Sequence, residues 1–166
     1  YPLRRQRQMC IRDSNTPCQN GLGATGYYLY DSITKDESVV VNQVLSSTGL
    51  CQQVKSEEAI DSVTALSGSG PAYVFAFAKA MQTAGVDMGL SEDNSTKLLL
   101  QTIKGALNLM ETSGKTFDEL IAAVKSKGGT TEAALKSFEE NKLEDLVVKS
   151  LNKAKSRAKE LSDSIV

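Results

Sequence analysis

Two polar, glycine-bearing segments hold the residues of this sequence that are best suited to chemistry. Residues 64–73 read Thr-Ala-Leu-Ser-Gly-Ser-Gly-Pro-Ala-Tyr, and residues 126–131 read Ser-Lys-Gly-Gly-Thr-Thr. In the second segment, hydroxyls and glycine-flanked backbone amides directly precede a predicted helix, whose dipole favours an anion at that end. The residue types and their order therefore predict that this segment binds a carboxylate or a phosphate.

Each segment also has a purely structural interpretation, which is the commoner one for either segment taken alone. Gly128 and Gly129 could end one helix while Thr130 or Thr131 caps the next. Gly68 and Gly70 could serve only to let two helices cross closely. The occurrence of both segments in one chain favours the functional interpretation.

The composition narrows the possible chemistry, because the 166 residues include no His. Most zinc chemistry and Ser-His-Asp catalysis are thereby excluded, and hydroxyls, carboxylates, lysines or backbone amides must act instead. The three cysteines, Cys10, Cys18 and Cys51, have neither metal-site spacing nor an even number for disulfides. We therefore expect no metal site and a reducing, cytoplasmic setting.

Charge and hydropathy argue against two classes of partner. The net charge is −1, four arginines lie within residues 1–14, and Arg157 is the single arginine in the rest of the chain. A nucleic-acid interface would need a basic face with interleaved aromatics, so no nucleic acid is expected. The longest apolar run, residues 72–80, contains Lys79 and is far shorter than the ~20 residues of a membrane span. No membrane partner is expected either.

The chain divides into three predicted parts. Residues 1–14 lack helical or strand periodicity, which indicates an artefactual leader, with a disordered basic arm as the alternative. Residues 15–56 predict a strand over 24–30, a helix over 36–47 and a strand over 50–54. Because such a parallel unit needs further strands, we interpret it as the C-terminal remnant of a larger α/β domain. Residues 57–166 predict a mainly α domain.

The helical part has recognisable helix starts. Ser91 caps a helix that runs to Gly114, Thr116 and Glu119 form a capping box, Thr131 begins a third helix, and residues 143–161 form a last long one. An earlier helical stretch over residues 57–84 is expected to break at residues 67–71. Its second half is apolar almost all round, which predicts burial on more than one side and hence a partner subunit.

Residues 63–73, 85–89 and 126–135 closely resemble the C-terminal domain of the pyrroline-5-carboxylate reductase family, with further landmarks at residues 15–17 and 45–49. The resemblance extends from residue 15 to about residue 161. It implies a Rossmann domain that binds NADPH or NADH, followed by a helical domain like the C-terminal domain of 6-phosphogluconate dehydrogenase, which forms a homodimer through interleaved helices. It also implies the reduction of 1-pyrroline-5-carboxylate to L-proline, the last step of proline biosynthesis.

The resemblance also assigns roles to individual residues. Thr64 corresponds to a catalytic threonine beside the ring nitrogen of the substrate, and the substrate carboxylate is bound by Ser126, Gly128, Gly129, Thr130 and Thr131. A nicotinamide supplies the hydride, which explains why no His is needed. Since a threonine hydroxyl is a weak acid, Thr64 is expected to orient the substrate more than to donate a proton. The sequence differs from the family pattern at two positions, with Ala65 in place of Gly and Lys127 in place of Pro. Lys127 either steers the anionic substrate or is simply solvated.

One family feature is missing from the sequence. Residues 21–26, Gly-Leu-Gly-Ala-Thr-Gly, precede a predicted strand and not the helix that a pyrophosphate site requires. We therefore expect a truncated reductase with no cofactor-binding residue of its own, inactive by itself. The alternative is a non-catalytic helical dimerisation module with a vestigial anion site. A β-hydroxyacid-type dehydrogenase is disfavoured, because residues 58–71 lack a catalytic Lys. The choice between NADH and NADPH, and assembly beyond a dimer, stay open.

Overall fold

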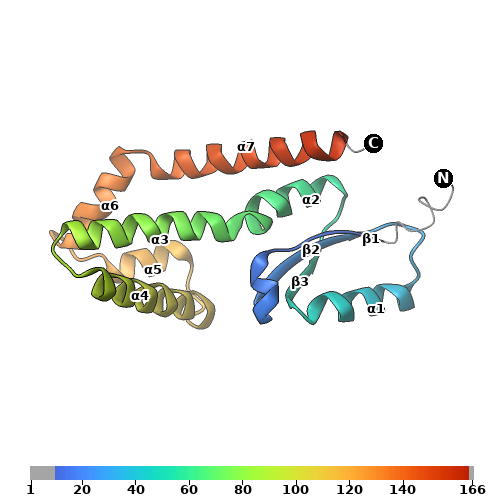
Figure 1. Cartoon of the computed structure of the whole chain (residues 1–166), viewed down its shortest axis with the longest axis horizontal. Helices are drawn as coiled ribbons and strands as arrows, with labels where there is room; N and C mark the ends of the chain where they lie inside the picture. The colour runs from blue at the N-terminus through green and yellow to red at the C-terminus, as the bar shows by residue number, and fades with distance from the viewer. Residues whose placement is uncertain (1–9, 165–166) are drawn as a thin grey trace. The chain divides into compact units, whose positions relative to one another are not determined.

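A computed structural model describes residues 10–164 of the chain, which divides into two compact units. We call residues 1–74 with 148–166 the sheet unit and residues 75–147 the helical unit. Each unit is described by itself, with the element labels of Figure 1. Among the described residues, no helix is long and apolar enough to cross a membrane. The predicted fold class, a mainly α domain preceded by a small α/β part, is confirmed.

The sheet unit contains three strands, β1 (Cys10–Asp13), β2 (Gly23–Leu29) and β3 (Gly49–Gln53). Strand β2 is central, antiparallel to β1 and parallel to β3. A short 3-10 helix, η2 (Thr16–Asn20), precedes β2, and helix α1 (Lys35–Ser46) connects β2 to β3. The predicted strand, helix and strand over residues 24–54 are confirmed, each within one residue of its expected start.

Strand β1 corrects the predicted extent of the leader. Cys10 lies opposite Leu29 and Asp13 opposite Gly26, so these residues belong to the sheet. The expectation that all of residues 1–14 stay outside the fold is wrong for Cys10–Asp13. The physical reason is that the free edge of β2 presents unpaired backbone groups, which an extended segment satisfies whatever its side chains. Residues 1–9 of the predicted leader lie outside the described residues.

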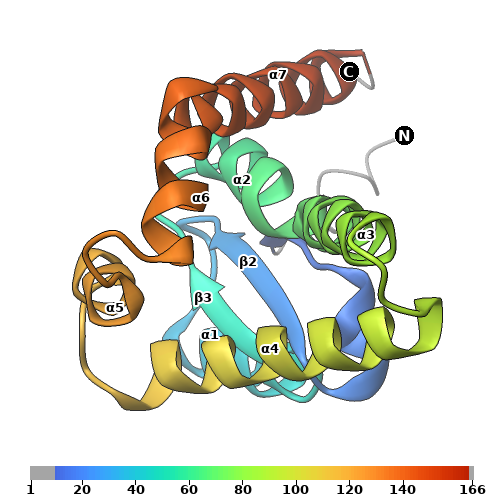
Figure 2. The same ribbon diagram turned by 90° about the vertical axis from the view of Figure 1, so that its left-hand side faces the viewer.

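Helices α1 and α2 (Glu58–Val63) pack on opposite faces of the sheet, as Figures 1 and 2 show. A Cβ added to Gly26 would meet the side chain of Val63 in α2. The hydroxyl of the next residue, Tyr27, accepts a hydrogen bond from Asn42 of α1 at 3.1 Å. Since successive strand residues point to opposite faces, these two contacts place one helix on each face. The missing side chain at Gly26 lets α2 approach the sheet closely.

The helical path through residues 58–87 is interrupted within the predicted break, and it contains a segment that was not predicted. After α2 the chain forms one π-helical segment, η3 (Thr64–Gly68), and then continues as α3 (Gly70–Asp87). The Ser69 amide donates to the Thr64 carbonyl, five residues earlier, at 2.9 Å. The predicted break is confirmed at Ser69, which separates η3 from α3, whereas the π-helical segment before it was not predicted. Pro71 lies in the first turn of α3, where the sequence placed it.

The helical unit contains most of α3 and the helices α4 (Glu92–Thr112), α5 (Phe117–Val124) and α6 (Thr130–Glu140), and it includes the start of α7 (Leu143–Asp163). The predicted caps at Ser91 and Thr116 are confirmed. The Thr116 amide and hydroxyl both donate to Glu119, at 2.8 and 3.0 Å, and these bonds hold the pKa of the Glu119 carboxyl below its usual value. Helix α6 begins one residue earlier than predicted, after Gly129 as its N-cap.

Helices α3 and α4 touch at Gly85, which explains the glycine of the motif at residues 85–89. A Cβ on Gly85 would collide with the Oγ of Ser95. Ser95 is 4% exposed, and its hydroxyl donates to the Gln82 carbonyl at 2.9 Å. The Gln82 side chain in turn donates to Thr96 at 2.6 Å. Close approach of the two helices therefore depends on the missing side chain at Gly85.

We expect Gly85→Ala to lower the midpoint of thermal unfolding by several degrees. Overpacking of this kind costs about 1–3 kcal/mol, which outweighs the at most about 1 kcal/mol that Ala gains over Gly within a helix. Circular dichroism during heating measures the effect. Thr83→Ala is the matched control, because Thr83 is exposed on the same helix and its hydroxyl bonds only the Lys79 carbonyl.

Adding Ser95→Ala removes the oxygen with which the new methyl group collides. The double variant should therefore lose less stability than the sum of the two single variants. Strictly additive losses would contradict the contact between Gly85 and Ser95.

Candidate functional site

The first part of the candidate site is Thr64, the first residue of the π-helical segment η3. Its side chain is partly exposed, and its hydroxyl donates to the Ile60 carbonyl one turn earlier, at 3.0 Å. A hydroxyl whose proton is engaged in this way still presents oxygen lone pairs as acceptors. Thr64 is therefore arranged to accept a hydrogen bond from an N–H group, which is the geometry of an orienting residue.

Asn15 adjoins this part of the site and was recognised in the sequence only as a landmark of the resemblance. Its side-chain nitrogen donates to the Ser67 carbonyl of η3 at 3.0 Å. Its side-chain oxygen accepts from the Ala24 amide at the start of β2, also at 3.0 Å. Asn15 thus connects the sheet to the helical turn that begins at Thr64.

The second part is the loop between α5 and α6 together with the first two residues of α6, which we call the anion loop (residues 125–131). Gly128 has φ 72°, a left-handed conformation that disfavours other residues. The Gly129 amide donates to the Ser126 carbonyl at 3.0 Å, and a Cβ on Gly129 would collide with the Ser126 hydroxyl. The backbone path of the loop therefore requires glycine at position 128, and Gly129 leaves room for the Ser126 hydroxyl.

Thr130 and Thr131 are the first two residues of α6, so the helix itself offers no acceptor for their amides. Within the described part of the chain, neither amide nor hydroxyl of these residues has a hydrogen-bond acceptor. Thr130 is exposed and Thr131 partly exposed. These groups can therefore bind an anion, as the sequence predicted.

A carboxylate of the chain itself already lies at the anion loop. The Gly128 amide donates to Oε2 of Glu132 at 2.7 Å, and Nζ of Lys125 lies 3.6 Å from Oε1 of the same carboxylate. The loop therefore accepts a carboxylate oxygen, but the Gly128 amide is engaged by Glu132. Sequence reasoning missed Glu132, although a Glu at the third position of a helix commonly reaches back to its N-terminus.

The space beside the anion loop suits a small acid. An open hollow of about 540 Å³ adjoins Gly128 and Gly129, and the charges in its lining are balanced, with Lys125 and Lys136 beside Glu132 and Glu139. Lys127, the departure from the family, is exposed in the same loop. Thr64 belongs to the sheet unit and the anion loop to the helical unit, so the five loop residues that the sequence assigned lie together within one unit and Thr64 lies in the other.

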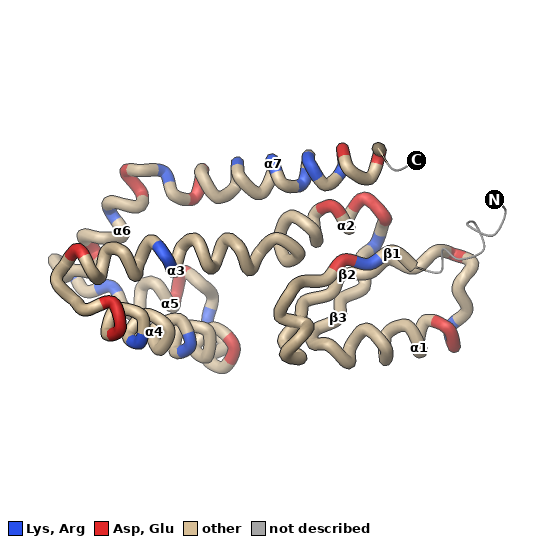
Figure 3. Tube along the Cα trace, viewed as in Figure 1, with Lys and Arg blue, Asp and Glu red and all other residues tan. Residues whose placement is uncertain are grey.

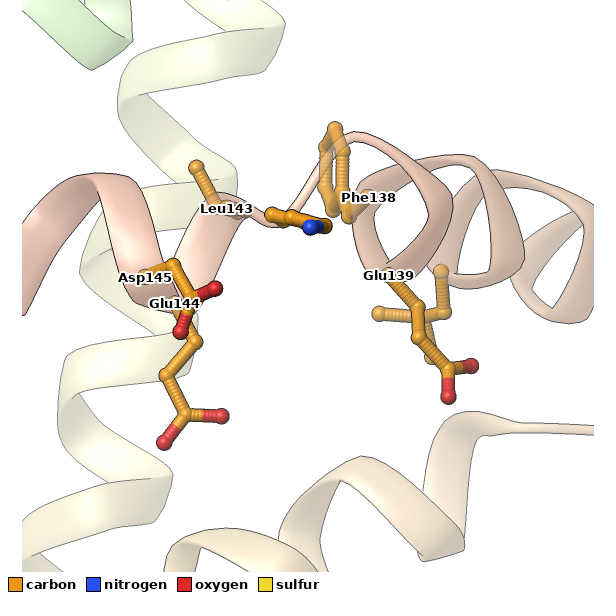
Figure 4. A pocket seen from close by; sticks show the side chains of 7 residues that line it. Phe138, Glu139, Leu143, Glu144 and Asp145 are labelled. Carbon is orange, nitrogen blue, oxygen red and sulfur yellow. The ribbon is translucent and has the colours of Figure 1, made fainter.

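A second hollow, at the turn between α6 and α7, has the wrong charge for an anionic ligand. Figure 4 shows the labelled side chains of Phe138 and Glu139 from α6 and of Leu143, Glu144 and Asp145 from α7 around it. Three carboxylates line it against one cation, Lys142, so its net negative charge would repel an anion, and none of the predicted site residues lines it. The anion loop is therefore the better candidate.

Comparison with known proteins agrees with the motifs. Residues 57–161 match the family model described as "Pyrroline-5-carboxylate reductase dimerisation". The chain belongs to the pyrroline-5-carboxylate reductase family. The matched range contains Thr64, the π-helical segment and the whole anion loop, so both parts of the candidate site lie on family positions.

Individual relatives support the same family. A pyrroline-5-carboxylate reductase of Pseudomonas aeruginosa is 41% identical over 151 residues, which cover 91% of this chain and 55% of that protein. Pyrroline-5-carboxylate reductase 2 of Bacillus subtilis is 32% identical over 149 residues, covering 90% of this chain and 53% of that protein. The chain therefore spans about half the length of the curated relatives that it matches.

Solved structures agree in fold. A pyrroline-5-carboxylate reductase of Coxiella burnetii has a TM-score of 0.87 and 37% identity, covering 92% of this chain and 56% of that one. A pyrroline carboxylate reductase of Plasmodium falciparum, solved with NADP bound, has a TM-score of 0.86 and 34% identity, covering 91% of this chain and 62% of that one. The fold of the reductase family is thus shared by nearly the whole chain.

We expect Glu132→Gln to move the amide proton signal of Gly128 upfield in a nuclear magnetic resonance spectrum. Hydrogen bonds to a charged acceptor are stronger than bonds to a neutral amide, so the substitution weakens this contact. The Gly129 amide, which donates to Ser126, should shift much less. Glu139→Gln is the matched control, because Glu139 lines the same hollow without a hydrogen bond to the loop. An unmoved Gly128 signal in Glu132→Gln would show that the two groups do not interact.

Proposed function

We propose that this chain is the C-terminal part of a pyrroline-5-carboxylate reductase, which reduces 1-pyrroline-5-carboxylate to L-proline in the last step of proline biosynthesis with NADPH or NADH. The observation that carries the proposal is the family match over residues 57–161 in a chain that keeps an acceptor at Thr64 and free amides at Thr130 and Thr131. In this proposal residues 15–56 complete a dinucleotide-binding domain, and residues 57–166 bind substrate and dimerise.

The anion loop binds the substrate carboxylate in this proposal. The amides and hydroxyls of Thr130 and Thr131 donate to its oxygens, at a helix end where the dipole favours negative charge. Ser126, Gly128 and Gly129 give the loop its path. The imine nitrogen is bonded to the ring carbon that carries the carboxylate, so binding the carboxylate also restricts where the imine lies.

Thr64 orients the imine nitrogen. The substrate reacts as its protonated iminium, whose N–H donates to the Thr64 oxygen while the Thr64 hydroxyl continues to donate its proton to the Ile60 carbonyl. Holding the proton on nitrogen keeps the ring carbon electrophilic, and hydride addition there yields the secondary amine of L-proline. Such a hydrogen bond contributes on the order of 1–3 kcal/mol. No general acid with a pKa near neutrality is required from the protein.

The described residues do not themselves form a site for the dinucleotide. The glycines at positions 21, 23 and 26 lead into or lie within β2, and none of them begins a helix with free amides for a pyrophosphate. The proposal therefore assigns the cofactor to a domain that residues 15–56 only complete. All three cysteines are free thiols, which supports a reducing, cytoplasmic location.

We also propose a homodimer that covers the apolar surface of α3. Val74, Phe75 and Phe77 are 54%, 65% and 48% exposed in the single chain. Figure 3 shows that α3 is nearly free of charged residues, in contrast to α7. Burying a side chain of this size contributes about 1.5–3 kcal/mol, so a partner helix on this surface would stabilise the assembly strongly.

The proposed activity is tested in a chimera that joins residues 15–166 to the N-terminal part of the Pseudomonas aeruginosa relative. We expect NAD(P)H oxidation that depends on 1-pyrroline-5-carboxylate. Thr64→Val should lower kcat/KM about tenfold or more because it removes the acceptor for the iminium N–H. Thr64→Ser, which keeps the hydroxyl, is the matched control and should retain most of the activity.

Two outcomes would contradict this proposal. A folded chimera without substrate-dependent oxidation would favour a non-catalytic dimerisation module with a vestigial anion site. Full activity in Thr64→Val would remove Thr64 from the mechanism.

The proposed dimer is tested by size-exclusion chromatography with light scattering. We expect twice the mass of one chain, and a shift toward the monomer in Phe75→Glu, because a charge cannot be buried cheaply in an apolar interface. Val39→Glu is the matched control, since Val39 is 54% exposed on α1, which is not the proposed interface helix. A well-folded monomer of the unchanged chain would refute the assignment.

A further inference from the structure

Pro71 leaves one backbone acceptor of the helical path without its usual donor. In a continuous α-helix the Ser67 carbonyl would accept from the amide of residue 71, four positions later. Residue 71 is proline, which has no amide proton. A carbonyl left unpaired in a partly buried position destabilises the fold, so this one needs a donor from elsewhere.

The donor is the side chain of Asn15. Its Nδ2 lies 3.0 Å from the Ser67 carbonyl oxygen, and the two residues are 52 positions apart in the sequence. Its Oδ1 is fixed by the Ala24 amide at 3.0 Å, so the amide group has one orientation and its nitrogen points at η3. Asn15 is only partly exposed. A long-range side-chain contact thus supplies the hydrogen bond that Pro71 withholds.

This contact bears on Thr64 because Ser67 lies in the same π-helical segment. The extra residue in that segment is accommodated by the bond from the Ser69 amide to the Thr64 carbonyl, at 2.9 Å. An ordinary α-helical turn would instead rotate Thr64 by about 100° relative to the residues that follow it, since each residue of a helix with 3.6 residues per turn adds that angle. The π-helical turn therefore sets the direction of the Thr64 side chain relative to α3.

We propose that Asn15 is a positioning residue for Thr64. By occupying the Ser67 carbonyl that Pro71 leaves without a donor, it stabilises the π-helical turn and with it the orientation of the Thr64 hydroxyl. The role in catalysis rests on the proposed function, in which Thr64 contacts the substrate nitrogen. The structural part of the inference concerns only Asn15, Ser67 and the turn, and it is tested without substrate.

The test uses this chain and measures the scalar coupling across the hydrogen bond from the Ser69 amide nitrogen to the Thr64 carbonyl carbon. We expect this coupling in the unchanged chain. Asn15→Asp keeps the acceptor for Ala24 but loses the donor, so the coupling should disappear and the unfolding midpoint should fall. Asn42→Asp is the matched control, because Asn42 also ties a helix to the sheet, through Tyr27, but has no contact with η3. It should leave the coupling intact.

Pro71→Ala separates positioning from stability. It restores an amide that can donate to the Ser67 carbonyl, so the double variant Asn15→Asp, Pro71→Ala should regain stability. In this variant we expect a coupling from the residue 71 amide to the Ser67 carbonyl, and no coupling from the Ser69 amide to the Thr64 carbonyl. A merely structural role for Asn15 predicts regained stability with the original coupling. Survival of the Ser69 to Thr64 coupling in Asn15→Asp or in the double variant would overturn the proposal. Loss of activity in the chimera has no bearing on this result, so the two proposals fail independently.

Discussion

The side-chain amide of Asn15 makes the two hydrogen bonds on which the geometry of the sheet unit depends. One bond goes to the start of the central strand and the other to the helical turn that begins at Thr64. On the far side of the same turn, Gly26 lets Val63 of α2 approach the sheet closely. The hydrogen bonds of Asn15 and the missing side chain at Gly26 thus fix the position of the turn. Because the turn is held at both ends, the Thr64 hydroxyl keeps one direction.

The second constraint on the structure is the large apolar surface that the single chain leaves exposed. Among the described residues, the buried hydrophobic side chains are Tyr27, Ile60, Ala65 and Leu99, while most large apolar side chains of α3 are exposed. In the helical unit, the edge-to-face contact of Phe77 with Phe138, with ring centroids 6.5 Å apart, is one of few aromatic contacts. Local capping and the contact at Gly85 define the helices. The hydrophobic driving force that holds them together must come largely from contact of their exposed apolar side chains with further protein surface.

The structural features that could be predicted from the sequence are those that depend on residues close together in the chain. The capping box of Thr116 and Glu119 and the strand predicted over residues 24–30 follow from residues only a few positions apart, and both are confirmed, the strand one residue earlier. Strand β1 was missed because pairing at a free sheet edge depends on backbone groups and not on a side-chain pattern. The π-helical turn was missed because its stabilising contact joins residues 52 positions apart. The anion loop was found from Gly128, Gly129, Thr130 and Thr131, whereas the contact of Glu132 with Gly128 depends on a rotamer that no periodicity reveals.

The hydrogen bond from the Thr64 hydroxyl to the Ile60 carbonyl has a consequence for how a reductase of this kind would respond to acidity. The groups assigned to the substrate are hydroxyls and backbone amides, which keep their protons throughout the physiological range, and the chain contains no His. A site of this composition has no internal switch between protonation states. In the proposed function, the ionisation that governs turnover then belongs to the imine, and Thr64 favours the charged form of the substrate by offering that form an acceptor.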